Sequence, residues 1–293
     1  MNYTEKGSKL YLFSIVLVAV IGGLLFGYDT AVISGAEKGL QAFFMGADFE
    51  YTDAIHGITS SSALIGCIIG SAVSGFFASG LGRKNSLFLA GILFFLSALG
   101  SYYPEFLFFE HGVPSYSLLV AFNFYRVLGG IGVGLASAIC PMYIAEIAPS
   151  NIRGTLVSWN QFAIIFGQLV VYFVNFLILG SHANPVIDLV NGVNQIMNPE
   201  AAAWTTETGW RLMFVSEAVP AGLFALLVLL VPETPRYLAM CGKDERALNV
   251  LSRINGASQA KVILAEIKAT TEEKTERLFT YGWMVIFIGI MLS

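Results

Sequence analysis

The sequence is poor in charge, cysteine and histidine. Only 12% of its 293 residues are charged and 56% are hydrophobic, whereas soluble proteins have about a quarter of their residues charged. The 16 Lys and Arg are outnumbered by 20 Asp and Glu, so no basic surface is available for a phosphate backbone. Cys67, Cys140 and Cys241 lack CxxC or His-rich spacing and predict neither a disulfide framework nor a metal site. These absences exclude a soluble domain and a nucleic-acid partner, and they indicate a fold surrounded by lipid.

Long apolar runs are abundant instead. A hydrocarbon core of about 30 Å needs roughly 20 residues of helix. Six runs meet this length: Leu10 to Tyr28, Ala54 to Gly82, Asn85 to Pro104, Val127 to Ala145 with an extension upstream to about Tyr116, Gly154 to Ile187, and a sixth that is interrupted at Glu217 and continues from Ala218 to Val231. We therefore predict an all-α membrane protein with a six-helix bundle over 1–231. The shorter run over 278–293 is interpreted as the truncated start of a seventh helix.

Residues 232–277 have a different composition. They hold 15 charged residues, and apolar residues recur among them at helical spacing. Thirteen of the 16 Lys and Arg fall in this segment, at the N-terminus or in the loops on the same side, whereas the opposite side has nine acids and Lys38 alone. Basic residues concentrate on the cytoplasmic side of a membrane. We expect a cytoplasmic N-terminus and a cytoplasmic linker of amphipathic helices.

Three ionisable residues fall inside the predicted spans. Such residues are costly, by roughly 2.5–3.5 kcal/mol each on insertion scales, and usually serve a function. Asp29, Arg126 and Glu217 lie at similar depth below the outer ends of their helices. An Asp and an Arg at one depth can form a charge-assisted bond, which predicts a proton switch formed by Asp29 and Arg126. The alternatives are an ion pair that only fixes packing and, for Glu217, a partner such as Arg211 or a water molecule.

The fifth run carries a stripe of amides. Gln161, Gln168 and Asn175 are spaced by seven residues, which places them along one helix face. Amides offer uncharged donors and acceptors that suit the hydroxyls of a sugar. Phe26 is expected to stack on the apolar face of the sugar, with Trp159 and Tyr172 as further candidates. Hydrogen bonding between helices and simple packing remain the alternatives.

Small residues recur every fourth position in two of the runs. Gly66, Gly70 and Ser74 share one helix, and Gly130 and Gly134 another, which predicts close approach of helix backbones. The glycines near Gly130 follow no strand, so they do not predict a dinucleotide site. A Ser/His/Asp or Cys/His arrangement is also absent from the sequence. We expect neither an enzyme nor a cofactor.

Several motifs resemble those of one transporter family. They are Arg126-Val-Leu-Gly-Gly-Ile-Gly-Val-Gly134, Pro141-Met-Tyr-Ile-Ala-Glu146 with Arg153-Gly154, Gly209-Trp-Arg211 and Pro232-Glu-Thr-Pro-Arg236. In this order they resemble the sugar porters of the major facilitator superfamily. The stretches 22–35 and 160–168 are most similar to bacterial proton-coupled D-xylose symporters. The resemblance covers nearly all of the chain.

The resemblance implies two six-helix halves that alternate access to a sugar bound between them in the bacterial cytoplasmic membrane. Asp29 matches the proton-coupling acid and Arg126 its partner, while Gln161, Gln168 and Phe26 match positions near the sugar. A cytoplasmic latch is implied as well. We assign to it Gly82, Arg83, Lys84, Glu146, Arg153, Glu217 and Arg236.

Two departures from the family pattern stand out. Ser79 and Gly80 occupy positions where an acid and a base are usual in the latch. The sequence also ends at Ser293, before the second half of the fold, so we expect this chain to require a C-terminal half and to be inactive alone. The leading hypothesis is proton-coupled symport of a pentose such as D-xylose, or of a hexose. A sugar facilitator without proton coupling, and a truncated remnant or sensor that does not transport, are the alternatives.

Overall fold

A computed structural model describes residues 7–47, 49–106, 112–180 and 203–272. The chain divides into two compact units, one of residues 9–234 and the other of residues 1–8 and 235–293. Residues 278–293, the predicted start of a seventh helix, lie outside the described part. The two units are treated separately below.

The larger unit consists of six apolar helices, each long enough to cross a membrane. They are α1 (Lys9–Met45), α2 (Asp53–Gly80), α3 (Arg83–Tyr102), α4 (Tyr116–Ile147), α5 (Arg153–Gly180) and the span Thr205–Leu230. The last span comprises the π-helix η1 (Thr205–Gly209), α7 (Trp210–Val215) and α8 (Ala218–Leu230). The prediction of an all-helical fold with six spans is confirmed for the described residues.

Local sequence signals set several helix starts. The Thr52 hydroxyl accepts a hydrogen bond from the Ile55 N–H at 3.4 Å and caps α2, and Ser115 caps α4 through the Leu118 N–H at 3.2 Å. Gly82 precedes α3 with φ at 90°, a conformation that residues with a Cβ rarely adopt. The turn between α2 and α3 therefore requires glycine at this position.

Two helix boundaries differ from the charge-free runs. The first run ended at Tyr28, but α1 continues to Met45, because the charge of Asp29 is neutralised by Arg126 inside the bundle. The sixth span begins at Thr205, so the helical part extends twelve residues upstream of Glu217, where the apolar run is interrupted. Helix α5 is described only to Gly180, and residues 181–187 lie outside the described part.

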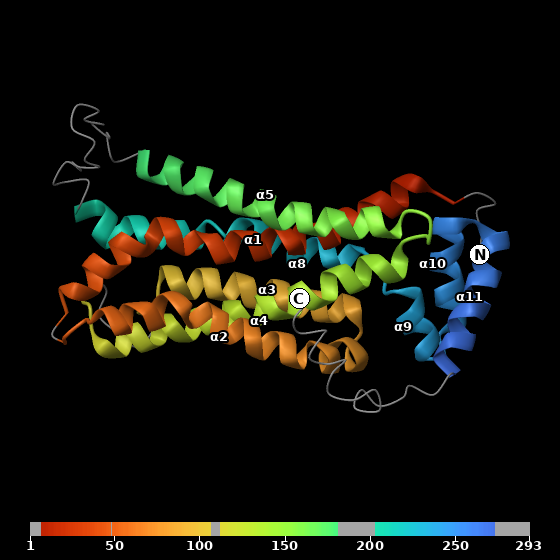
Figure 1. Cartoon of the computed structure of the whole chain (residues 1–293), viewed down its shortest axis with the longest axis horizontal. Helices are drawn as coiled ribbons and strands as arrows, with labels where there is room; N and C mark the ends of the chain where they lie inside the picture. Colours follow the sequence, from red (N-terminus) through yellow and green to blue (C-terminus); the bar gives the residue numbers. More distant parts are fainter. Residues whose placement is uncertain (1–6, 48, 107–111, 181–202, 273–293) are drawn as a thin grey trace, which may run out of the picture. The chain divides into compact units, whose positions relative to one another are not determined.

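The helices of the larger unit pack in close pairs. Helix α5 runs beside α1, and α4 packs against both α2 and α3 (Figure 1). A Cβ on Gly66 would lie 2.1 Å from the Val127 carbonyl oxygen, and one on Gly130 would lie 2.0 Å from that of Ala63. The close backbone approach predicted at these glycines is present, and the structure adds that α2 and α4 are each other's partners.

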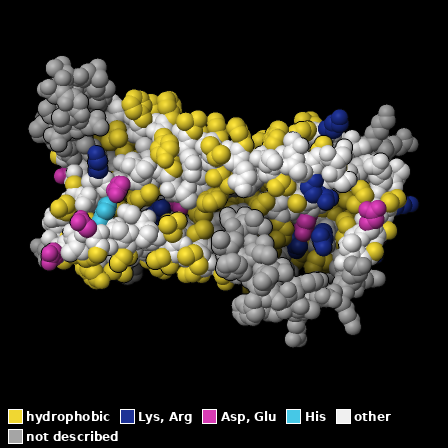
Figure 2. Space-filling view, in the orientation of Figure 1, with side chains coloured by type: hydrophobic (Ala, Val, Ile, Leu, Met, Phe, Trp, Pro, Cys, Tyr) yellow, Lys and Arg dark blue, Asp and Glu magenta, His cyan; other side chains and the backbone are white. Residues whose placement is uncertain are grey.

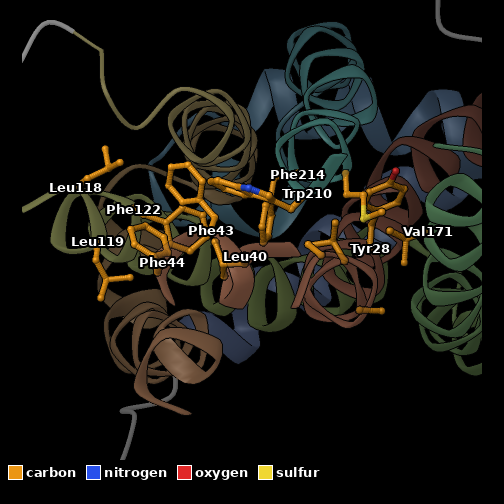
Figure 3. Packing of buried hydrophobic residues seen from close by; sticks show 14 residues of the cluster. Tyr28, Leu40, Phe43, Phe44, Leu118, Leu119, Phe122, Val171, Trp210 and Phe214 are labelled. Atoms are coloured by element: carbon orange, nitrogen blue, oxygen red, sulfur yellow. The ribbon is translucent and has the colours of Figure 1, made fainter. Parts of the chain in front are cut away.

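An aromatic cluster fills the bundle near one end of α1. The rings of Phe122, Trp210 and Phe214 lie within 5.4–6.3 Å of one another, and Phe43 lies 5.6 Å from Trp210 (Figure 3). Edge-to-face pairs of this kind add about 0.5–1.5 kcal/mol beyond their buried area. The cluster ties the sixth span to α1 and α4 and so fixes the helices that carry the site.

The surface of the larger unit is mainly hydrophobic. Figure 2 shows apolar side chains spread along the helices and few charged ones among them. Large apolar side chains such as Phe162, Ile165 and Leu169 on α5 are more than 60% exposed. Contact with lipid or with further protein is the environment that suits such a surface.

The described residues of the smaller unit form three helices, α9 (Pro235–Met240), α10 (Asp244–Asn255) and α11 (Ala257–Glu272). Helix α10 buries Val250, Leu251 and Ile254 on one face, as an amphipathic helix does. An ion pair between Lys268 and Asp244 joins α11 to α10. The unit therefore has its own small core.

Candidate functional site

The centre of the site is an ion pair buried inside the larger unit. Arg126 Nη1 on α4 donates to Asp29 Oδ1 on α1 over 2.6 Å, and the two side chains are 3% and 0% exposed. The ring centroid of Phe214 lies 5.0 Å from the guanidinium carbon of Arg126. Removing one partner of such a pair leaves an uncompensated buried charge, which costs about 3–5 kcal/mol. The contact predicted between Asp29 and Arg126 is present.

A second carboxyl group lies beside this pair. Glu217 is 1% exposed, and Asp29 and Arg126 are the charged groups that act on its carboxyl. Among the described residues, no donor contacts Asp29 Oδ2 or Glu217 Oε1. Two ionised carboxylates only accept hydrogen bonds, so they can bond to each other only when one carries a proton. The site thus combines two acids with one arginine.

This position of Glu217 corrects two expectations. Glu217 was assigned to the latch, but it lies sixteen residues before Glu233, which follows the sixth span and contacts Lys84 of the latch. Arg211 was considered as its partner, yet Arg211 donates to both oxygens of Glu105 at 2.5 and 2.7 Å. The register of the sixth span places the two residues at different depths, because about six residues of helix separate them by roughly 9 Å.

The three amides of α5 do not form one open stripe. Gln161 is exposed and Gln168 is half-buried, whereas Asn175 is buried and donates from Nδ2 to the Val32 carbonyl oxygen at 3.4 Å. A seven-residue spacing falls about 20° short of two full turns, so the third amide rotates toward α1. Asn175 therefore joins two helices and does not share the open face predicted for it.

The aromatic candidates also differ in their surroundings. Phe26 is half-buried on α1, one turn before Asp29. Trp159 and Tyr172 are 43% and 52% exposed on α5, and the Trp159 ring lies 5.7 Å from that of Phe13. Phe26 and Gln168 are the candidates for sugar contact that are half-buried, and Phe26 is the one that lies a single turn from Asp29.

Three residues of the predicted latch, Arg83, Lys84 and Glu146, belong to one hydrogen-bond network at the end of the bundle where α2 is followed by α3. Arg83 Nη2 donates to Glu146 Oε1 at 2.8 Å, and Glu146 Oε2 accepts from the Thr234 hydroxyl at 2.6 Å. The backbone N–H of Lys84 donates to the Glu233 carboxyl at 3.1–3.2 Å. These contacts join α2–α3, α4 and the segment after α8.

Burial raises the pKa of the Glu233 carboxyl above its usual range, although bonds from the Thr234 and Lys84 N–H groups act in the opposite direction. Sequence reasoning did not single out Glu233 or Thr234, although both lie in the quoted motif 232–236.

The prediction also assigned Arg153 and Arg236 to the latch. Arg153 is exposed and donates to the Ala148 carbonyl oxygen at 3.4 Å, which closes the turn before α5. Arg236 is exposed on α9 and belongs to the smaller unit. Among the residues described here, no cluster of three His, Cys, Asp or Glu could hold a metal ion.

A buried ion pair inside a bundle of six spans, with a charge network at one end, is the arrangement expected of a membrane transporter. Residues 15–293 match the family of sugar (and other) transporters, and the chain belongs to this family. It is an integral membrane protein.

The curated relatives include sugar symporters and a facilitator. The chain is 46% identical to the D-xylose-proton symporter of Escherichia coli strain K12 over 97% of its length, and 35% identical to the arabinose-proton symporter of Bacillus subtilis strain 168 over 99%. It is 32% identical over 99% to a glucose facilitated diffusion protein of Zymomonas mobilis. These matches span 56%, 56% and 58% of the relatives, so the chain covers little more than half of their length.

Solved structures agree with this placement. The proton:xylose symporter XylE bound to 6-bromo-6-deoxy-D-glucose matches with a TM-score of 0.85 at 45% identity, over 97% of this chain and 58% of that one. The partially occluded, inward-open form of XylE from E. coli matches with a TM-score of 0.82 at 45% identity, over 96% and 62%. The six spans described above thus correspond to part of a known transporter fold.

Proposed function

We propose that this chain supplies the proton-coupling half of a sugar symporter. The observation that carries the proposal is the buried group of Asp29, Arg126 and Glu217. Two carboxylates and one guanidinium leave one net negative charge in a site without access to water. One added proton neutralises it, which relieves the penalty for an uncompensated buried charge.

Binding and release of that proton would change the helix contacts. When both acids are ionised, Arg126 must serve two carboxylates, and when one is protonated it serves a single one. Asp29, Arg126 and Glu217 belong to α1, α4 and the α7–α8 turn. Protonation of either acid would therefore change how these three elements pack. Coupling needs such a link between a proton and the shape of the bundle.

The sugar would bind on the open side of α1 and α5. Gln161 and Gln168 offer amide groups there, and Phe26 offers a partly exposed ring. We omit Asn175 from this site because its amide is engaged by α1. The named relatives carry D-xylose or arabinose with protons, which supports a pentose as substrate. A second half, of the kind that the longer relatives possess, would close the site from the opposite side.

The network of Arg83, Glu146, Thr234 and Glu233 would act as the cytoplasmic latch. In the orientation that we propose, the N-terminus and residues 232–277 lie in the cytoplasm of a bacterium and the bundle lies in its inner membrane. It is supported by the excess of Lys and Arg on that side of the sequence.

Uptake into sealed vesicles tests the proposal. The chain, completed with the C-terminal half of the E. coli D-xylose symporter, is assayed with and without an inward proton gradient. Asp29→Asn should abolish accumulation above the outside concentration but keep sugar exchange, because the binding groups remain and only the proton site is lost. Glu37→Gln removes another carboxylate from α1, one that is 51% exposed, and should accumulate sugar like the parent.

Uphill uptake that survives Asp29→Asn would refute proton coupling through this site and favour a facilitator. A parent protein that binds and exchanges no sugar would instead favour a chain that does not transport.

A further inference from the structure

The turn that carries Glu217 has a tightened hydrogen-bond pattern. The Glu217 N–H bonds to the Phe214 carbonyl oxygen at 3.3 Å, three residues back, while the Met213 carbonyl accepts from the Ser216 hydroxyl at 2.5 Å. A bond to the third preceding residue winds the chain at 3.0 residues per turn instead of 3.6. Each residue then turns by about 120° instead of about 100°, which rotates the Glu217 side chain relative to a regular helix.

Ser216 also joins this turn to α1. Its Oγ lies 2.7 Å from the hydroxyl of Tyr28, whose side chain is buried in the aromatic and aliphatic core. A serine hydroxyl has one proton, and Ser216 gives it to Met213, so Tyr28 is the donor in the bond between them. The result is a short chain of two hydrogen bonds from α1 to the backbone of the sixth span.

Each hydroxyl residue directly precedes one of the two acids. Tyr28 is followed by Asp29, and Ser216 by Glu217. Neighbouring residues of a helix point about 100° apart, so Tyr28 and Asp29 contact different partners. Arg126 holds Asp29 on one side of α1, while Tyr28 holds the α7–α8 turn on another. Together these contacts fix both the rotation and the depth of α1 against that turn.

We propose that Tyr28 and Ser216 are positioning residues of the proton site, and that their hydrogen bond sets the spacing of the Asp29 and Glu217 carboxyl groups. This inference rests on the proposed proton-coupled function. The spacing decides whether one proton is shared between the two acids or resides on one of them alone. Neither hydroxyl contacts the sugar or carries the proton in this role.

Removing either hydroxyl should loosen this spacing without dismantling the bundle. The loss of one hydrogen bond costs about 1 kcal/mol, whereas the packing of the Tyr28 ring is kept in Tyr28→Phe. The turn would relax toward regular helix, and the Glu217 carboxyl would move away from Asp29. A proton on either acid would then lack its carboxylate acceptor.

Infrared spectroscopy of the purified 293-residue chain in lipid nanodiscs tests the inference. The carboxylic acid C=O stretch shifts to lower wavenumber when the acid donates to a carboxylate. We expect such a low band in the parent, and we expect it to be lost in both Asp29→Asn and Glu217→Gln, because each removes one member of the acid–carboxylate pair. Tyr28→Phe and Ser216→Ala should move it to higher wavenumber, and the double variant should equal either single variant, because both act through one bond.

Two variants serve as controls. Thr30→Val removes a hydroxyl one residue after Asp29 that bonds to the carbonyls of Phe26 and Gly27 in its own helix, and it should leave the band in place. Ser216→Thr keeps a hydroxyl and should preserve the parent band. Circular dichroism checks that every variant retains its helix content.

The outcomes separate the two proposals. A parent band that does not respond to Asp29→Asn or Glu217→Gln would overturn the proton site itself, and with it this inference. A responsive band whose position is unchanged in Tyr28→Phe and Ser216→Ala would overturn only the positioning role. If Thr30→Val moves the band as far as Tyr28→Phe and Ser216→Ala do, the effect follows from any loss of a hydroxyl on α1. That result would also overturn the positioning role.

Discussion

Two buried arginines of the larger unit have different surroundings. Arg211 donates to both oxygens of Glu105 and also to the carbonyls of Tyr102 and Glu207, and the Trp210 ring centroid lies 4.6 Å from its guanidinium carbon. Arg126 has one short bond to Asp29 and a second acid nearby. A guanidinium with many fixed partners suits a structural joint, whereas one faced by two acids can exchange between them. We therefore assign a structural role to the first and a functional role to the second.

The Glu105–Arg211 pair predicts a pH-dependent stability. Burial by itself would raise the pKa of the Glu105 carboxyl, but hydrogen bonds from Arg211 and its positive charge outweigh this and hold the pKa below its usual range. Such a group stabilises the fold above the unfolded-state pKa of about 4.3, and the contribution is lost as the pH falls from there through the folded-state pKa. Glu105→Gln should remove about 3 kcal/mol at neutral pH, because Arg211 stays buried without a counter-charge.

Thermal unfolding in detergent between pH 7 and pH 3 measures this contribution. The variant should melt well below the parent at pH 7, and the two should converge toward pH 3. Glu50→Gln changes an exposed acid on the loop after α1 and should follow the parent throughout. Equal melting of Glu105→Gln and the parent at pH 7 would show that the pair does not stabilise the fold.

At the scale of single residues, sequence reasoning found the charges but not all of their partners. The depths of Asp29 and Arg126 follow from their places in two predicted helices, and their contact is present. Glu105 was read as an acid on the outer side because it follows the apolar run to Pro104. Its pairing with Arg211, 106 positions away, depends on how the end of α3 packs against α7. One sequence contains no signal for such a distant contact.

At the scale of helices, the contact between α2 and α4 makes a second prediction. The Val127 carbonyl oxygen of α4 faces Gly66 of α2. A Cβ at Gly66 would lie only 2.1 Å from this oxygen, so Gly66→Ala must push the two backbones apart. Overpacking of this kind costs about 1–3 kcal/mol. Thermal unfolding of the purified chain should therefore start at a clearly lower temperature in this variant.

Gly75 provides the matched control on the same helix. A Cβ there would meet nothing within 4 Å, so Gly75→Ala should equal the parent or exceed it by up to about 1 kcal/mol through its higher helix propensity. If both variants melt at the same temperature, close backbone contact is not what requires glycine at position 66.

Helix identity was easier to predict than helix ends. Four-residue spacing of glycines indicated a close backbone contact because the period of a helix fixes which residues share a face, but it did not show that α2 and α4 are partners. The end of α1 was not given by hydropathy, since Asp29 interrupts the apolar run although its charge is compensated within the fold. The tightened turn at Ser216 was not predicted either, because the hydrogen bond that links it to α1 is made between Ser216 and Tyr28 across the bundle.

At the scale of the whole molecule, the basic residues predict the orientation. Eight of the 16 Lys and Arg lie from Arg236 to Arg277, and the N-terminus and the loops on the same side add five more. A reporter that works only in the cytoplasm should therefore be active when it is fused near Lys261, and a reporter that works only in the periplasm should be inactive there. A fusion near Gly112, between α3 and α4, should show the opposite behaviour. A periplasmic reporter that is active at Lys261 would reverse the proposed orientation.

The last prediction concerns transport by these 293 residues alone. They cover 56% of the E. coli symporter, and alternating access needs two bodies that close on a shared site. Gln161 and the exposed apolar side chains of α5 would have no protein opposite them. We expect the chain to insert into the membrane but to show no saturable sugar uptake when it is reconstituted by itself.

Co-expression with the C-terminal half of the E. coli symporter should restore uptake if the open side of α1 and α5 is the face that the second half covers. Phe162→Asp places a charge on that side of α5, at a residue that is 69% exposed, and should prevent the rescue. Phe76→Asp changes a residue of α2 that is 77% exposed and tests whether the effect is specific to α5. Saturable uptake by the purified chain alone would contradict the prediction and would indicate that two copies form the site together.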